Sequence, residues 1–545
     1  MPLNRPRPRR WVVPIVAVFL LLGSGIVTAA PPVASPIASP AASPVTGPGD
    51  TASDLYDAVQ PDLRDDIVAA TAGRLSRYRI DAALIETRGR NPRKVEGQLD
   101  LRFVNDTGDA LGEIYFRLYA NDPIYGDGDM EIGKATVAST PVAPELSVDD
   151  TVLRVPLPRR LVSGAAIDLT LAFTAMVPVG PTSGYGLFAF QPKPSTWVLA
   201  HWYPMIAGHD AGGWNLDPVS RNGDPIFSNT SLYDVRLTTP GGLEVVATGD
   251  ETANETQGAT IQHRYVSGPV RDFTIVADDN LASVSREEGG TTITSFYDPT
   301  DAEGGTRVLD AAVRALHTFT DRLGPYPYRE MDLVQVPLQG ASGVEFPQLL
   351  FLGSDIYGDP SRYRAPNYLE FVTAHEVGHQ WFYALVGNNQ YDHAFIDEGL
   401  VEYLSSDVYF GDQYGAAAGD RTYKLETEVW YLSQLFSVGD EVIDQPTDDF
   451  PTEAAYGATV YGKGAVAFHA LRADIGDDAF FTALRDYAAR YQFAIATPAD
   501  LRAAFERAAG RDLGPFWTSW FERADGLKVF SPDDYAALRA ELGLG

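Results

Sequence analysis

The stretch "FVTAHEVGHQWFYALVG", residues 371–387, places two histidines four positions apart with a glutamate beside the first. The longer segment that contains it, residues 367–387, follows Pro366 and ends in glycine, and its content predicts a helix that runs to Gly387. On a helix, His375 and His379 lie one turn apart on the same face. Two imidazoles at this spacing can bind one metal ion, and Glu376, rotated by about 100° around the axis, can reach a water molecule on that ion. The spacing therefore favours a metal site with a general base over two polar residues on an ordinary helix.

A third ligand follows in "AFIDEGLVEYLSSDVYF", residues 394–410, which predicts a second helix. Glu398 lies there, 18 intervening residues after His379. The chain has no cysteine, so a metal must be bound by histidine and carboxylate side chains. Two histidines and a glutamate leave a fourth coordination position for water, which is typical of hydrolytic zinc. Glu402, one turn after Glu398, either orients a ligand or is an exposed helix glutamate.

Composition bounds the class of protein. The 545 residues are 45% hydrophobic, enough for two or three globular domains. Lys and Arg number 42 against 73 Asp and Glu, a net charge of −31. Nucleic-acid binding needs clustered cations, so we expect no nucleic-acid partner.

The N-terminus predicts export. "MPLNRPRPRR" carries four arginines, and the 20 residues that follow, 11–30, are free of charged side chains and end in small residues. Residues 1–30 are therefore expected to be a signal peptide or an N-terminal membrane anchor, since an apolar run of this length can also span a bilayer once. Residues 31–50 are rich in proline, alanine and serine and predict a linker. The folded part is then extracellular, or anchored to the outer face of the cell membrane.

Periodicity divides the rest of the chain. Apolar residues at four-residue spacing predict a helical extension over 51–80. Segments such as "KVEGQLDLRFVND" (94–106) alternate apolar and polar residues between turn residues and predict a mainly antiparallel β domain over 81–290. Amphipathic segments such as "TPADLRAAFERAAG" (497–510) predict a mainly α domain over 291–525. Residues 526–545 are expected to be a short C-terminal tail.

Four separated motifs together resemble one family. They are "GASGVEFPQLLFL" (340–352), "HEVGHQWF" (375–382), "DEGLVEYL" (397–404) and "AAYGATVYGKGA" (454–465). Their kind and order resemble the gluzincin metallo-aminopeptidases of the aminopeptidase N and leukotriene hydrolase type. The resemblance implies an α+β multidomain fold, with an N-terminal antiparallel, saddle-like β domain followed by a mainly α, thermolysin-like zinc catalytic domain. The family's large C-terminal helical domain has no counterpart in the motifs, which indicates a short form.

The resemblance also implies a role for each motif residue. One Zn²⁺ per chain would be bound by His375, His379 and Glu398, with Glu376 as the general base. The remaining implied residues are Glu345 and Gly343 for substrate binding, with Glu345 anchoring a free α-ammonium, and Tyr461 for the oxyanion, with Tyr456 as an alternative or helper. A carboxylate paired with a cation in a dry site is worth far more than in water, and a phenol can stabilise an oxyanion without ionising.

The functional expectation is therefore an exported zinc aminopeptidase acting on peptides with a free N-terminus. Two alternatives from other classes stay open: a thermolysin-type metalloendopeptidase, which would lack the amine anchor, and an inactive exported zinc-binding module. A related epoxide hydrolase would share the motifs. The preferred first residue, peptide length and oligomeric state are not determined by the sequence.

Overall fold

The computed structural model describes residues 54–86, 93–180, 182, 184–210, 212–223, 227–358 and 367–544. The expected signal or anchor segment, 1–30, and the expected linker, 31–50, lie outside the described residues. Within the described part of the chain, no helix is both long enough and apolar enough to cross a membrane.

The N-terminal part is built from strands whose residues alternate between buried and exposed, as in β8. Its largest sheet has eight strands, all paired antiparallel except β1 with β14, which are parallel. The strands run in the order β16 (Asp250–Gln257), β17 (Thr260–Val270), β14 (Ser231–Pro240), β1 (Ser76–Ile85), β2 (Arg93–Val104), β8 (Ala166–Val177), β4 (Asp129–Val137) and β5 (Thr140–Pro141).

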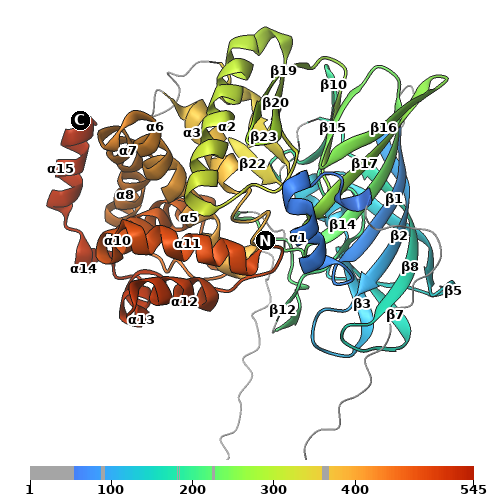
Figure 1. Ribbon diagram of the computed structural model, residues 1–545, viewed down its shortest axis with the longest axis horizontal. Helices are drawn as coiled ribbons and strands as arrows, with labels where there is room; N and C mark the ends of the chain where they lie inside the picture. The colour runs from blue at the N-terminus through green and yellow to red at the C-terminus, as the bar shows by residue number, and fades with distance from the viewer. Residues whose placement is uncertain are drawn as a thin grey trace, which may run out of the picture. The chain divides into compact units, whose positions relative to one another are not determined.

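Among the residues that the structure describes, three smaller antiparallel sheets complete the β-rich domain. One has the order β15 (Glu244–Ala247), β18 (Ile275–Asp278), β10 (Ser195–Leu199), β9 (Phe188–Pro192). The second is β11 (Met205–Ile206), β3 (Leu111–Arg117), β7 (Val152–Leu161), β6 (Glu145–Ser147), and the third pairs β12 (His209–Asp210) with β13 (Gly213–Trp214). The blue-to-green strands lie together in Figure 1, opposite the orange and red helices.

The helical extension expected over 51–80 is shorter than the periodicity indicated. Helix α1 occupies Pro61–Thr71, and β1 begins at Ser76 and pairs with β2 and β14. Tyr78 and Ile80 point into the core from β1, so burial of alternate side chains in the sheet decides the conformation here.

The boundary between the two domains, expected at residue 290, lies earlier in the structure. The strands β19 (Ala282–Glu288) and β20 (Thr291–Tyr297) belong to a separate mixed sheet, with the order β19-β20-β21-β23-β22. Its other members are β21 (Glu330–Val336), β23 (Leu349–Gly353) and β22 (Gly343–Phe346), an edge strand paired antiparallel to β23. Helix α2 (Ala302–Leu323) packs against β19, β20 and α3. The C-terminal domain therefore begins near residue 282.

The rest of this domain is helical, and the expected order of a β-rich domain followed by a mainly α domain is confirmed (Figure 1). The helices are α3 (Tyr368–Gly378), α4 (Gln390–His393), α5 (Glu398–Tyr403), α6 (Phe410–Tyr414), α7 (Ala416–Tyr423), α8 (Val429–Ser437), α9 (Glu453–Gly457), α10 (Gly464–Ile475), α11 (Asp477–Tyr491), α12 (Pro498–Ala509), α13 (Gly514–Trp520), α14 (Gly526–Val529) and α15 (Pro532–Leu542). Helix α12 begins with Thr497 as its N-cap residue, in a capping box with Asp500.

In the described part of the chain, three helices contain π-helical segments: η8 (Leu404–Tyr409) between α5 and α6, η9 (Lys424–Glu428) between α7 and α8, and η11 (Ala458–Lys463) between α9 and α10. Such segments are rare in proteins overall, and those that occur are often found at functional sites. Residues expected at the site lie on two of these helices, Glu398 on α5 and Tyr461 in η11.

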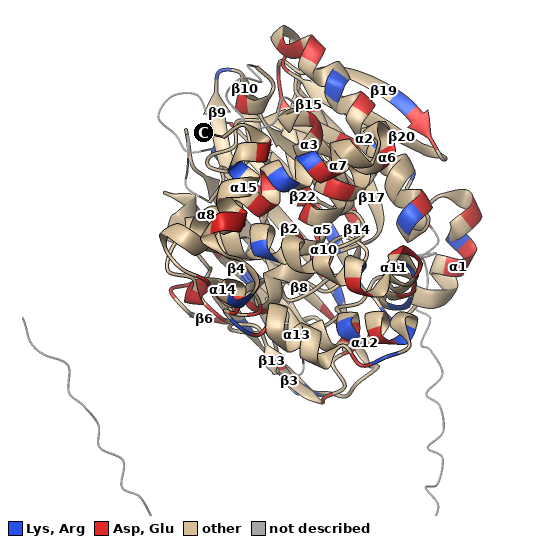
Figure 2. Cartoon of the chain, turned by 90° about the vertical axis from the view of Figure 1, so that its left-hand side faces the viewer, with Lys and Arg blue, Asp and Glu red and all other residues tan. Residues whose placement is uncertain are grey.

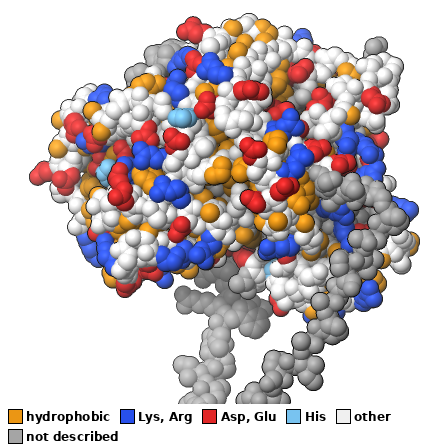
Figure 3. All heavy atoms as spheres, in the orientation of Figure 1, with side chains coloured by type: hydrophobic (Ala, Val, Ile, Leu, Met, Phe, Trp, Pro, Cys, Tyr) orange, Lys and Arg blue, Asp and Glu red, His pale blue; other side chains and the backbone are white. Residues whose placement is uncertain are grey.

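The expected C-terminal tail is partly helical. Helix α15 begins with a capping box at Ser531, buries Leu538 and Leu542, and contacts α8. On the face drawn in Figure 3, acidic side chains are interspersed with basic ones, and the ribbon of Figure 2 likewise carries both acidic and basic residues.

Candidate metal centre and active-site cleft

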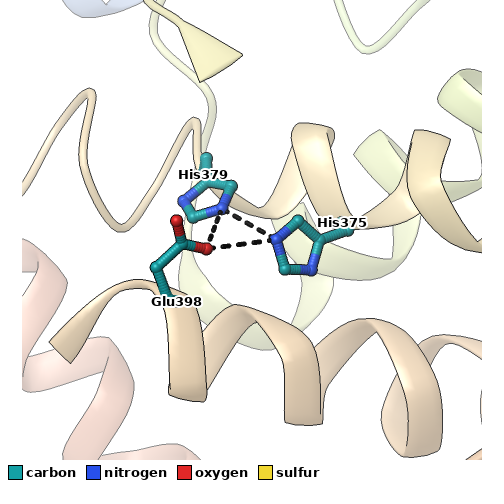
Figure 4. A group of neighbouring side chains, drawn as sticks. All are labelled: His375, His379 and Glu398. Carbon is teal, nitrogen blue, oxygen red and sulfur yellow. Dashed lines mark hydrogen bonds and ion pairs between the residues drawn. The ribbon is translucent and has the colours of Figure 1, made fainter. Parts of the chain in front are cut away.

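Three side chains from two helices converge on one point (Figure 4). His375 and His379 extend from the C-terminal end of α3, and Glu398 is the first residue of α5. The Nε2 atoms of the two histidines are 3.0 Å apart, and Oε2 of Glu398 lies 3.3 Å from Nε2 of His375 and 3.2 Å from Nε2 of His379. All three residues are buried. The structure thus brings together the three ligands that the spacing predicts.

The hydrogen-bond partners of the two rings determine which nitrogens are free to bind a metal. Nδ1 of His379 lies 3.1 Å from the backbone oxygen of Phe382, and Nδ1 of His375 lies 3.2 Å from Oε2 of Glu402. Both neighbours are oxygen acceptors, so a neutral ring that turns its proton on Nδ1 toward them presents the lone pair of Nε2. With both rings in this form, two lone pairs and a carboxylate oxygen face one another, an arrangement that a cation between them stabilises.

The donor set fits zinc in geometry and in charge. Tetrahedral coordination at about 2.0–2.1 Å separates ligand atoms by roughly 3.3 Å, close to the three distances found here. Burial opposes a positive charge on the imidazoles, but hydrogen bonds to Glu398 and Glu402 outweigh it and raise the pKa of His375 to about 9. The carboxylates around this point thus favour a cation there.

Glu376 lies next to the ligands and against an edge strand. Its carboxylate forms a second buried cluster with Glu345 and His379, with ligand atoms within 4.8 Å of one another. Its Oε2 atom is buried and has no hydrogen-bond partner among the described residues. A Cβ atom built on Gly343 would lie 2.1 Å from Oε1 of Glu376, so only glycine leaves room for the carboxylate. Burial raises the pKa of Glu376 to about 7.

Glu345 points into the same region from strand β22 and is buried. The amide nitrogen of Gln390 donates to Oε1 of Glu345 at 3.3 Å and to Oδ2 of Asp397 at 2.8 Å. Asp397 in turn accepts from the backbone N–H of Glu398 at 3.0 Å.

Sequence reasoning missed Gln390 and Asp397. Asp397 could have been noticed because it directly precedes a ligand at a helix start, whereas nothing in the pattern pointed to Gln390.

Tyr461 and Tyr456 both line the cleft, but their hydroxyl groups lie in different places. The hydroxyl of Tyr461 donates to Oε1 of Glu398 at 2.7 Å, and its ring stacks on His375 at 5.9 Å between centroids. The hydroxyl of Tyr456 faces Gly223 in the β-rich domain, where an added Cβ would lie 2.3 Å from it. Of the two tyrosines weighed from the sequence, Tyr461 is the one whose hydroxyl reaches the metal ligands.

These residues line a cleft of about 690 Å³. Its walls include the segment Gly340–Glu345, the side chains of Glu376 and Glu398, and aromatic residues that include Trp430 and Tyr461. This volume lies in the usual range of ligand-binding clefts, and the metal ligands His375 and Glu398 are among the residues that line it.

One expectation about the opening stretch is wrong. The helix does not run to Gly387: α3 ends at Gly378, and His379 is its C-cap residue. His379 still follows the helical path, because its N–H donates to the backbone oxygen of His375 at 3.3 Å. Beyond it the chain turns away, and Tyr383 has a φ of 116°, which no helix contains.

The fold and the site define a class: a two-domain protein whose helical domain holds a His-His-Glu metal centre with a neighbouring glutamate, at the wall of an open cleft. Residues 307–520 match the family model described as "Peptidase family M1 domain". This segment is similar to that peptidase family, and the resemblance predicted from the four motifs is confirmed.

Curated relatives support the same assignment. The chain is 22% identical over 493 residues to aminopeptidase M1-C of Oryza sativa subsp. japonica, which covers 85% of this chain and 52% of the relative. It is 25% identical over 253 residues to aminopeptidase M1-A of the same plant, covering 42% of this chain and 27% of the relative. The chain thus spans about half or less of the length of these relatives.

Among solved structures, the chain is similar to the M1 zinc metallopeptidase of Deinococcus radiodurans, with a TM-score of 0.59 and 18% identity over 83% of this chain and 93% of that chain. A variant of that protein bound to a Tyr-Ser-Ala substrate gives a TM-score of 0.59 and 18% identity over 82% of this chain and 94% of that one. At this identity the likeness shows a shared two-domain fold.

Proposed function

We propose that the chain is an exported zinc-dependent aminopeptidase that removes the first residue of peptides with a free N-terminus. One observation carries the proposal: the carboxylate of Glu345 lies in one buried cluster with Glu376 and the metal ligand His379, within 4.8 Å. An α-ammonium group bound by Glu345 would place the first peptide bond beside the metal centre. The zinc metallopeptidase neighbours and the aminopeptidase relatives support this reading.

His375, His379 and Glu398 would bind one zinc ion. Bound zinc supplies a water molecule whose pKa is lowered to about 7 and a positive charge for the developing oxyanion. Glu402 keeps the proton of His375 on Nδ1, and the Phe382 carbonyl does the same for His379, so that both Nε2 atoms stay available.

Glu376 is the proposed general base. Its buried Oε2 atom has no competing hydrogen bond among the described residues, so it can accept a proton from water and pass it to the leaving nitrogen. Burial raises its pKa to about 7, close to the working pH, where a group can both accept and return a proton.

Tyr461 is the proposed oxyanion donor. Its hydroxyl lies at the metal site, where it donates to Oε1 of Glu398. A carbonyl oxygen that becomes negatively charged there can replace Glu398 as the acceptor, because the phenol needs no change of ionisation to donate.

Glu345 and Gly343 are the proposed substrate-binding residues. Both belong to the edge strand β22, whose outer side pairs with no further strand among the described residues. Glu345 supplies the carboxylate for the α-ammonium, and Gly343 allows the strand to approach Glu376 closely. This amine contact would distinguish an aminopeptidase from a thermolysin-type endopeptidase, which shares the metal centre and base.

Export is proposed from the sequence alone. The four arginines of residues 1–10 and the uncharged run over 11–30 support either a cleaved signal or a single retained anchor. The catalytic domain would then act outside the cell or at the outer face of its membrane. Fractionation of cells that express the full chain, with protease protection of intact cells, tests this placement, and a product confined to the cytosol would contradict it.

The activity is tested with aminoacyl chromogenic amides beside the same peptides blocked by N-acetylation, with and without a chelator. We expect chelator-sensitive release from unblocked substrates only, and loss of release in Glu376→Gln with zinc retained. Glu345→Ala should lose activity on unblocked substrates, whereas Glu453→Ala, a cleft glutamate outside the catalytic set, serves as the matched control.

The outcomes separate the alternatives. Equal cleavage of blocked and unblocked peptides would replace the aminopeptidase by an endopeptidase and leave the zinc centre in place. Stoichiometric zinc without hydrolysis of either substrate would indicate a zinc-binding module.

A further inference from the structure

The segment that follows the first metal helix, residues 379–387, is here called the metal-site loop. Its fold depends on bonds that begin at the ligand His379. The N–H of Ala384 donates to the backbone oxygen of His379 at 3.0 Å, and Nδ1 of His379 lies 3.1 Å from the backbone oxygen of Phe382. The direction of the Phe382 carbonyl therefore sets which nitrogen of His379 carries the proton.

That carbonyl is followed by a residue in an unfavourable conformation. Tyr383 has a φ of 116°, a value that side chains with a Cβ rarely adopt. A residue of this kind persists only where its surroundings hold it in place. The twist at Tyr383 lets successive carbonyls serve different partners: that of Phe382 faces His379, and that of Tyr383 faces the β-rich domain.

The partner from the β-rich domain is Arg271, which directly follows β17 and is 2% exposed. Its Nε donates to the backbone oxygen of Tyr383 at 2.6 Å, and one terminal nitrogen donates to Leu385 at 3.3 Å and Ala494 at 2.6 Å. Its other terminal nitrogen donates to the backbone oxygen of Ser228, in the β-rich domain, at 3.0 Å. One guanidinium group thus connects two carbonyls of the metal-site loop to both domains.

Two further contacts complete this arrangement. The hydroxyl of Tyr383 donates to the carboxylate of Asp272, the residue after Arg271. Gly387, at the end of the metal-site loop, lies flat against the guanidinium, where an added Cβ would be 2.2 Å from its central carbon. Although burial lowers the pKa of Arg271 to about 10, the group keeps its charge at neutral pH, and its bonds to carbonyl oxygens are therefore charge-assisted.

We propose that Arg271 and Asp272 are positioning residues for the metal ligand His379, so that the β-rich domain sets the metal affinity of the helical domain. They hold Tyr383 in its unfavourable conformation, and Tyr383 directs the Phe382 carbonyl onto Nδ1 of His379. The inference rests on the proposed metal centre. It assigns a function in metal binding to residues more than 100 positions before the ligand.

The test measures zinc affinity by competition with a chromophoric chelator, on the full chain, together with the melting temperature of the zinc-free protein. Arg271→Lys keeps the charge beside Asp272 but cannot reproduce the planar set of donors. Partners that orient a ligand typically change metal affinity about 10–100-fold, and we expect a loss in that range. Tyr383→Phe removes only the hydroxyl bond to Asp272 and should weaken zinc binding in the same direction by a smaller factor.

The matched control is Tyr328→Phe. The Tyr328 hydroxyl donates to the backbone oxygen of Pro269, another buried bond between the domains, two residues from Arg271, and this bond does not involve the metal-site loop. It should lower the melting temperature and leave zinc affinity within about twofold of the wild type. The visible spectrum of the Co²⁺-substituted protein, which reports ligand geometry, should change in Arg271→Lys and stay the same in Tyr328→Phe.

Wild-type zinc affinity in a folded Arg271→Lys protein would overturn the inference, as would an equal loss of affinity in Tyr328→Phe. If Arg271→Lys does not fold, Tyr383→Phe decides the question by the same criterion. His379→Ala separates this inference from the proposed function: a wild-type chain that binds zinc no better than His379→Ala would overturn the metal centre itself.

Discussion

Replacement of Gly343 by alanine tests how closely the edge strand β22 approaches the general base. The backbone at Gly343 is not in the left-handed region, so alanine fits its conformation. The new methyl group would lie 2.1 Å from Oε1, 2.5 Å from Cδ and 2.7 Å from Cγ of Glu376. Ordinary contact begins near 3.4 Å, and the Glu376 carboxylate must therefore withdraw by about 1.3 Å.

The effect should appear in catalysis and hardly in stability. A displacement of about 1 Å of a reacting group costs roughly 10²-fold in rate, so we expect kcat/KM on an unblocked aminoacyl amide to fall by about that factor. The displaced atoms are the far end of a flexible side chain, which keeps the change in melting temperature small. Zinc content should stay at the wild-type level, because the added methyl's nearest neighbours all belong to Glu376 and not to a ligand.

The assay compares kcat/KM, zinc content and melting temperature in Gly343→Ala and in Gly112→Ala. Gly112, in strand β3, has no atom within 4 Å of the position of an added Cβ and should behave like the wild type. Undiminished kcat/KM in Gly343→Ala would refute the placement of Glu376 against β22. Loss of zinc together with activity would show that the methyl group disturbs the ligands rather than the base.

Three further predictions test other parts of the structure. Tyr461→Phe should lower kcat by about 10²–10³ with little change in KM, whereas Tyr456→Phe should cause a much smaller loss; equal losses would contradict the assignment of the oxyanion donor. Glu402→Leu removes the acceptor for Nδ1 of His375 and should weaken zinc binding by about 10–100-fold in chelator competition, and unchanged affinity would exclude this orienting role. Burial raises the pKa of Asp250 to about 7, above its value of about 3.9 in an unfolded chain. The folded state therefore holds the carboxyl proton more tightly than the unfolded state does. The free energy of unfolding should fall as the pH rises from about 4 to 7, because the folded protein must then give up this proton. Asp250→Asn should therefore raise the melting temperature at pH 8 and leave it nearly unchanged at pH 4; no difference at pH 8 would show that this carboxyl is not strained by burial.

The parts of the site that could be predicted from sequence are those set by local periodicity. His375 and His379 share a helix face because they are four residues apart, and Glu398, 18 intervening residues after His379, begins α5. The alternating strands and the amphipathic helices were likewise recognisable, since each element buries one face of its own repeat. The resemblance of four motifs then implied Glu345 and Tyr461, which no spacing could have joined to the ligands.

Errors arose where long-range contacts override the local pattern. Residues 76–80 join a sheet whose partners lie far along the chain, and burial of their side chains in that sheet outweighs the spacing that indicated a helix. The helix expected to reach Gly387 stops at Gly378, because the carbonyls of Tyr383 and Leu385 bind Arg271 instead of continuing the helical ladder.

By itself, the sequence determined the chemistry of the site: a cysteine-free chain with two histidines and a glutamate at helical spacing can build only an imidazole–carboxylate metal centre. Only the tertiary structure decided how the side chains of the site are oriented toward one another. It brings β22 within contact of Glu376, places Gln390 between Glu345 and Asp397, and ties the loop after His379 to Arg271. The physical reason is the distance along the chain over which each interaction acts. Backbone hydrogen bonds within a helix join residues four positions apart, whereas the orientation of these groups depends on bonds between segments that are distant in the chain.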